Sequence, residues 1–169
     1  MSAIEPHTPA LARILAENAR YADQLDRTAL PIPHGSKLAV LACMDPRLKV
    51  EHALGLHSGE AHIVRNAGGL ATDDAIRSLV ISQQVLGTTE VFVIAHTDCA
   101  MLTFRDADVQ RELVARTGAD VDLAFHAFSD LASNLREQVR RIEAHPWIKD
   151  APVHGLIYDV ETGRLREVA

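Results

Sequence analysis

Two strand-length apolar runs limit the folds open to this sequence. Residues 37–44 read "KLAVLACM", a continuous apolar stretch after its lysine that includes the β-branched Val40. Residues 89–99 read "TEVFVIAHTDC" and contain a second continuous apolar stretch, "VFVIA". Continuous rather than alternating hydrophobicity is typical of parallel strands that are buried on both faces. The two runs therefore predict a parallel sheet covered by helices.

Shorter patterns complete the predicted order of elements. A further strand is expected at "AHIVRN" (61–66), and two more at "VHGLIYDV" and "RLREV", around a turn that contains Gly163. Apolar periodicity predicts helices at 9–24, 73–87, 106–117 and 129–144, with a short helix or turn at 47–57. We expect a single α/β domain over residues 1–169, with about four parallel strands and a C-terminal edge strand.

Composition narrows the classes of function. The formal net charge is -6, which argues against a general nucleic-acid binder, whose binding surface would be basic. No stretch reaches the roughly 18 apolar residues that a membrane-spanning helix needs. The N-terminal segment has no secretory hydrophobic region, so we expect a cytoplasmic protein whose two cysteines remain thiols.

Unusual polar residues follow three of the predicted strands. Parallel sheets place their ligands just beyond the carboxyl ends of the strands, so residues far apart in sequence can meet there. The residues at the three strand ends are Cys43, Asp45 and Arg47; Arg65 and Asn66; and His96 and Cys99. This distribution predicts one site at one edge of the sheet.

Two of these strand ends carry donors that suit a metal ion. His96 and Cys99 stand three apart in "HTDC", so both side chains can reach one ion at a strand-to-helix turn. Cys43 completes a Cys2His set, and zinc favours thiolate and imidazole ligands in a tetrahedron. Three protein ligands leave a fourth position open, as in catalytic zinc sites.

Other interpretations of the same residues stay open. Taken singly, Cys43 is typical of a small buried hydrophobe and His96 of a hydrogen-bonded core histidine. The cysteines could form a redox pair, although they lie in distant segments rather than in C-x-x-C. The glycines of "RNAGG" (65–69) could bring backbone N–H groups to an anion, as in a nucleotide-binding module, or make a tight turn. Arg65 and Asn66 could line the cleft or brace that turn.

Four motifs together resemble those of the β-class carbonic anhydrases. They are "CMDPR", "RNAGG", "HTDCAM" and the C-terminal "GLIYDVETGRL". The resemblance runs from about Lys37 to the C-terminus and is to the short branch of the family, which also contains carbonyl sulfide and carbon disulfide hydrolases. One departure is Ala100, where the family usually has glycine. Alanine is compatible with a helix start of negative φ and would narrow any space beside the metal.

The resemblance implies a reaction and a role for each site residue. It implies Zn²⁺ on Cys43, His96 and Cys99, with Asp45 and Arg47 as a catalytic dyad. The implied activity is reversible hydration of carbon dioxide to bicarbonate and a proton through a zinc-bound hydroxide. The alternative is hydrolysis of carbonyl sulfide or carbon disulfide at the same site. Asp45 can also be a fourth zinc ligand in a closed form, and in a purely structural zinc site it would stay there.

The resemblance also implies a second copy of the chain as partner. The amphipathic N-terminal segment, residues 1–30, is expected to be a dimerisation arm that packs on the other subunit, in a homodimer or a dimer-based higher oligomer. The remaining partners are small-molecule substrates, with neither a nucleic acid nor a membrane among them. Six further histidines could carry protons if one lay at the mouth of the cleft: His52, His57, His62, His126, His145 and His154.

Overall fold

The structure is a computed structural model that describes residues 8–25 and 37–169. These residues belong to two separate compact units, one within residues 1–30 and the other within 31–169. The first unit contains the helix α1 (Pro9–Asp23), which begins with Thr8 as its N-cap and a proline in its first turn, and none of its residues is buried. The expected arm and its place in a single domain stay predictions.

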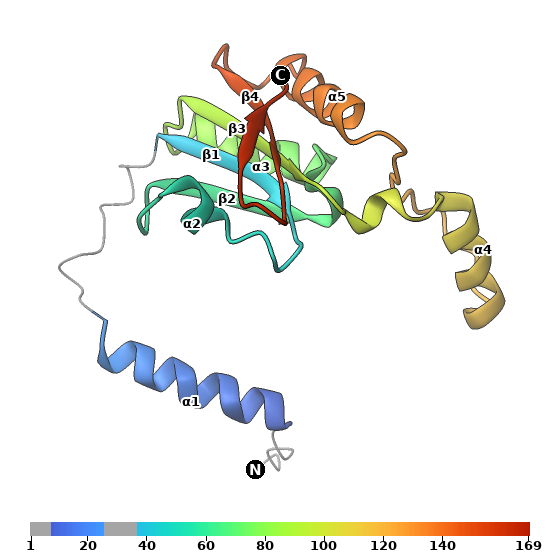
Figure 1. Ribbon diagram of the computed structural model, residues 1–169, viewed down its shortest axis with the longest axis horizontal. Coiled ribbons are helices and arrows are strands. Elements are labelled where there is room, and N and C mark those ends of the chain that lie inside the picture. The colour runs from blue at the N-terminus through green and yellow to red at the C-terminus, as the bar shows by residue number, and fades with distance from the viewer. Residues whose placement is uncertain (1–7, 26–36) are drawn as a thin grey trace. The chain divides into compact units, whose positions relative to one another are not determined.

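The second unit is built on a five-stranded sheet (Figure 1). Its strands are β1 (Leu38–Cys43), β2 (Ala61–Asn66), β3 (Glu90–His96), β4 (Val153–Tyr158) and β5 (Leu165–Glu167). The spatial order is β2-β1-β3-β4-β5, with parallel pairing throughout except for the antiparallel β5 at one edge. The predicted α/β class, with four parallel strands and a C-terminal edge strand, is confirmed.

Helices cover both faces of this sheet. The helical segments are α2 (Val50–Leu54), η2 (Ala67–Gly69), α3 (Asp73–Gln84), η3 (Ala100–Leu102), α4 (Asp106–Thr117) and α5 (Leu131–Glu143). Side chains of α3 and α5 pack with alternate residues of β1, β3 and β4 in one core, and α2 covers part of the opposite face (Figure 1). Leu41 of β1 and Leu79 of α3 are fully buried, and each such side chain stabilises the fold by about 1.5–3 kcal/mol.

Among the helices of the second unit, α4 differs from the others because no residue in it is buried. It projects beyond the end of the sheet and is followed by a return segment that leads into α5 (Figure 1). Its sequence pattern predicted a helix at 106–117, and those bounds are confirmed. Among the described residues, no helix is long and apolar enough to cross a membrane.

One strand is shorter than the sequence indicates. The apolar run at 89–99 suggests a strand through Cys99, but β3 ends at His96. The backbone of Asp98 has φ of 54°, in the left-handed region, which takes the chain out of the extended conformation. The turn at 97–99 then places Cys99 beside the end of β3 instead of further along it.

Candidate metal centre

Three predicted donors meet at the carboxyl edge of the sheet. Cys43 is the last residue of β1 and His96 the last of β3, while Cys99 immediately precedes η3. Parallel register of β1 with β3 sets Ala42 beside Ile94, so the two strands end at the same level. The Sγ atoms of both cysteines and a ring nitrogen of His96 all lie within 4.8 Å of one another. The exposed fractions of Cys43, His96 and Cys99 are 4%, 1% and 2%.

The ring of His96 is oriented as a metal ligand would be. Its Nδ1 lies 2.8 Å from the carbonyl oxygen of Thr97. A carbonyl can only accept a hydrogen bond, so Nδ1 carries the proton and Nε2 presents a lone pair. Nε2 is buried and, within the described part of the chain, has no hydrogen-bond partner. A buried polar atom without a partner costs about 1–3 kcal/mol, so this nitrogen fits a role as ligand to a metal ion that the two thiols would also bind.

The two cysteines are not joined in a disulfide, and a hydrogen bond links their side chains. The hydrogen bond from Cys99 lowers the pKa of Cys43 to about 4 against the effect of burial, with smaller contributions from the nearby His96 ring and from the backbone N–H groups of Asp45 and Gly68. The same hydrogen bond and burial raise the pKa of Cys99. A thiolate and a second sulfur beside an unpaired imidazole nitrogen form a donor set suited to zinc. A redox pair would leave the orientation of His96 unexplained.

Asp45 and Arg47 form the bidentate pair that their spacing suggests. Arg47 donates from Nε to Oδ1 of Asp45 at 3.0 Å and from Nη2 to Oδ2 at 2.8 Å. The backbone N–H of Arg47 also donates to Oδ1, at 2.9 Å. The side chain of Arg47 therefore holds the pKa of Asp45 well below its usual range. Oδ2 of Asp45 lies 3.9 Å from Nε2 of His96, so the carboxylate faces the donor set without bonding to it.

Asp98 is a member of this group that the sequence analysis did not single out. Nη1 of Arg47 donates to Oδ2 of Asp98 at 2.7 Å, and Nη2 donates to the Asp98 carbonyl at 3.0 Å. Its position inside "HTDC" was the only available signal, because a carboxylate between two candidate ligands must lie near them.

Arg65 and Asn66 brace the site from β2. Arg65 donates from Nε to the Cys43 carbonyl at 2.9 Å and from Nη2 to the Asp45 carbonyl at 2.7 Å. The amide of Asn66 both donates to and accepts from the backbone of Leu70, at 2.7 Å in each case. The sequence left open whether Arg65 and Asn66 line the cleft or brace the turn, and their contacts in the described part of the chain are of the bracing kind.

The glycines of "RNAGG" allow two segments of backbone to touch. Gly69 has φ of 65°, and a Cβ there would stand 2.9 Å from the backbone nitrogen of Cys43. Glycine is therefore required for both conformation and space, in agreement with the tight-turn interpretation. The N–H of Gly68 contacts an anion of the chain itself, because it favours the Cys43 thiolate. Ala100 begins η3 and is not among the described non-glycine residues with positive φ, so its backbone conformation is compatible with alanine.

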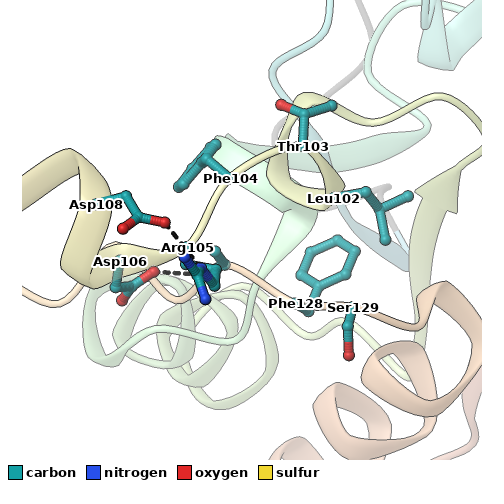
Figure 2. Close-up of a pocket in the computed structure, with 9 residues that line it drawn as sticks. Leu102, Thr103, Phe104, Arg105, Asp106, Asp108, Phe128 and Ser129 are labelled. Atoms are coloured by element: carbon teal, nitrogen blue, oxygen red, sulfur yellow. Dashed lines mark hydrogen bonds and ion pairs between the residues drawn. The ribbon is translucent and has the colours of Figure 1, made fainter.

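A pocket of about 550 Å³ lies at the base of α4 (Figure 2). Three apolar residues of its wall, Leu102, Phe104 and Phe128, also pack against the buried cluster that contains both cysteines. Its charged side includes Arg105, whose Nε donates to Asp108 at 2.8 Å. Part of the pocket wall thus packs directly against the buried cluster that holds the two cysteines.

Asp106, also in the pocket wall, fastens the return segment after α4. Its carboxylate accepts backbone N–H groups of Phe125 at 2.9 Å, His126 at 2.8 Å and Ala127 at 2.8 Å. The N–H of Ala127 contributes most to a lowered pKa of Asp106, with those of His126 and Phe125. No sequence motif marks this clamp.

Two of the remaining histidines have partners away from the donor set. Nδ1 of His62 contacts the hydroxyl groups of Ser82 at 2.8 Å and Thr88 at 3.2 Å. His154 contacts Glu90 at 3.0 Å through Nε2 and stacks on Phe92. Neither histidine is placed to carry protons from the site.

Known proteins resemble this chain over most of its length. A family model described as carbonic anhydrase matches residues 38–165. The chain is 44% identical over 155 residues to β-carbonic anhydrase 1 of Mycobacterium tuberculosis, covering 91% of this chain and 94% of the relative. It is 36% identical over 177 residues to a carbon disulfide hydrolase of Acidianus sp., covering 90% and 87%. The crystal structure of a carbonic anhydrase from Streptococcus mutans superposes with a TM-score of 0.89 at 42% identity, covering 97% and 100%.

Proposed function

The chain belongs to the β-carbonic anhydrase family, and from that premise we propose that it catalyses the zinc-dependent, reversible hydration of carbon dioxide to bicarbonate and a proton. The observation that carries the proposal is the buried Nε2 of His96, which has no hydrogen-bond partner among the described residues and lies close to the thiols of Cys43 and Cys99. These three residues would hold the zinc ion. When bound, zinc acts as a Lewis acid that lowers the pKa of a water molecule, so that a nucleophile forms near neutral pH.

Asp45 orients the attacking water. Because Arg47 keeps its carboxylate ionised, Asp45 can only accept a hydrogen bond from the water and so directs the oxygen lone pair toward carbon dioxide. Its Oδ2 is 3.9 Å from Nε2 of His96, which supports this placement beside the metal. Arg65 fixes the backbone of the same segment through the Cys43 and Asp45 carbonyls.

Carbon disulfide or carbonyl sulfide is the second candidate substrate. The supporting observation is the 36% identity with a carbon disulfide hydrolase over most of the chain. All three substrates are small linear molecules attacked at carbon, so the same donors and the same Asp45 serve each of them. Turnover of each gas by one preparation of zinc-loaded protein decides between them.

The active form proposed is a cytoplasmic homodimer. Free thiols at Cys43 and Cys99 suit a reducing compartment. The apolar side chains of Leu11, Ile14 and Leu15 on α1 are exposed, which supports a second subunit as their partner. A chain that begins at Pro31 should sediment as a smaller species than the full chain, and an unchanged dimer would exclude the arm at 1–30.

The decisive experiment combines metal analysis with stopped-flow hydration of carbon dioxide. Wild-type protein purified without chelators should contain about one zinc ion per chain and hydrate carbon dioxide. The Asp45→Asn variant should keep its zinc and lose roughly 10²- to 10⁴-fold in rate, because the amide no longer acts only as an acceptor. Asp74→Asn is the matched control, since Asp74 also pairs with an arginine but lies on the exposed surface of α3.

Two results would reject the proposal in different ways. Protein without zinc would mean that the three donors serve another purpose, such as an anion-binding module. Zinc-loaded protein without hydration at any pH would indicate a structural metal site, with Asp45 as its permanent fourth ligand.

A further inference from the structure

The guanidinium of Arg47 is shared between two carboxylates. Its Nε and Nη2 face Asp45, while Nη1 donates to the carboxylate of Asp98 at 2.7 Å. The second hydrogen of Nη2 is taken by the Asp98 carbonyl, at 3.0 Å. Asp98 therefore contacts Arg47 through both side chain and backbone, and its contacts fix the direction in which the planar group points.

The backbone at Asp98 is held in an uncommon conformation. Its φ of 54° lies in the left-handed region, which non-glycine residues visit rarely and aspartate more readily than most. His96 and Cys99, two candidate metal ligands, flank it in the chain. This turn aims the carboxylate and carbonyl of Asp98 at one guanidinium.

We propose that Asp98 is a positioning residue that keeps the guanidinium of Arg47 turned toward Asp45, and so keeps Asp45 away from the metal. The inference rests on the proposed function, since it assumes zinc at Cys43, His96 and Cys99. Without the carboxylate of Asp98, Nη1 of Arg47 loses its acceptor, so the guanidinium turns toward solvent and releases Asp45, whose Oδ2 already lies 3.9 Å from Nε2 of His96. Asp45 then becomes a metal ligand and occupies the position that water needs.

Orientation rather than charge carries this effect. The side chains of Arg47 and Asp98 are 46% and 74% exposed, and attraction between exposed ions is weakened by water. A hydrogen-bond acceptor at the same position should therefore suffice. The ion pair between Asp74 and Arg77 is exposed to a similar degree, at 78% and 69%, and lies outside the site, so it offers a control for charge alone.

The test compares two substitutions of Asp98. Asp98→Gly removes the side chain and suits the left-handed backbone, so the fold and the carbonyl contact should persist. Asp98→Asn keeps an acceptor oxygen and also tolerates this backbone. We expect kcat for carbon dioxide to fall roughly 10- to 100-fold in the glycine variant, as for other residues that orient a metal site. We expect the asparagine variant to retain most of kcat, and Asp74→Asn to match wild type, all with unchanged zinc content.

A readout independent of activity is the position of Asp45 in crystal structures of the zinc-loaded proteins, grown at one pH. The carboxylate should lie on Arg47 in wild type and on zinc in Asp98→Gly. The proposal is overturned if Asp45 stays on Arg47 in that variant, if the asparagine variant is as impaired as the glycine variant, or if Asp98→Gly loses its zinc. If wild type binds zinc but does not hydrate carbon dioxide, the proposed function fails and the crystal structures still decide the role of Asp98.

Discussion

Two aspartates near the sheet edge are held ionised by different kinds of partner. The pKa of Asp45 is lowered mainly by the side chain of Arg47, and that of Asp106 by the backbone N–H groups of Ala127, His126 and Phe125. Arg47 is a long side chain that is 46% exposed, so it can swing away without disturbing the fold. Backbone donors cannot leave unless the whole segment moves.

The kind of hydrogen-bond donor therefore indicates whether each carboxylate can move. Asp45 can exchange Arg47 for another partner, and the donor set of Cys43, His96 and Cys99 lies next to it. Asp106 ties the segment after α4 to the first turn of that helix and has no exchangeable partner among its described contacts. Asp45 suits chemistry that needs a movable carboxylate, whereas Asp106 suits a permanent fastening.

The largest expected effect comes from breaking the donor set itself. In Cys99→Ser, a weak oxygen donor replaces a thiolate, and we expect zinc to be lost and hydration to fall to the uncatalysed background. Metal analysis and stopped-flow kinetics measure both. The hydrogen bonds between Asp106 and the segment after α4 should not change, so hydrogen exchange at the Ala127 amide should remain slow. Retention of zinc with normal turnover would show that Cys99 is not a metal ligand. The proposed metal site next to Asp45 would then no longer distinguish this aspartate from Asp106.

A smaller effect should follow when only the movable partner is removed. Arg47→Gln leaves Asp45 without its two-point contact, and we expect kcat to fall roughly 10- to 100-fold while zinc content is kept. The melting temperature should change little, because exposed ion pairs contribute little to stability. A full rate in this variant would show that Asp45 needs no restraint from Arg47.

The contact of Asp45 could be predicted from the sequence, whereas those of Asp98 and Asp106 could not, because their partners lie far away along the chain. Asp45 and Arg47 stand two residues apart after an apolar strand, so their pairing could be predicted locally. The Asp98–Arg47 contact spans 51 residues, and those of Asp106 span 19 to 21. Such contacts depend on how the turns after β3 and α4 are directed, and no periodicity encodes that direction.

The same limit applies to the fold. Apolar runs predicted the strands, because a strand that is buried on both faces needs apolar residues at successive positions. The order β2-β1-β3-β4-β5 depends on crossovers that the runs do not specify. For α4, the pattern indicated a helix but not that it would project from the sheet, since amphipathic periodicity does not identify the partner surface.

Removing the fixed clamp should alter stability rather than chemistry. In Asp106→Asn, one amide oxygen remains for three backbone donors, and we expect the free energy of unfolding to fall by about 1–3 kcal/mol. Urea denaturation measures the change, and the hydration rate per bound zinc should match wild type. Asp108→Asn is the matched control in the same helix turn, because its partners are exposed arginine side chains and its loss should not be measurable. A large loss of activity in Asp106→Asn would show that Asp106, like Asp45, contributes to catalysis.

The smallest expected effect is the pH dependence of that stability difference. Since folding lowers the pKa of Asp106, the unfolded chain takes up the proton first as the pH falls. The contribution of Asp106 is therefore complete above the ordinary aspartate pKa of about 3.9 and is lost as the pH falls through the lower folded value. Urea denaturation of wild type and Asp106→Asn should give a constant difference at neutral and mildly acidic pH, which then shrinks on further acidification. A difference that persists unchanged in acid would mean that Asp106 stabilises the fold whether or not its carboxyl group is ionised. The comparison with Asp45 as two ionised carboxylates would then not hold.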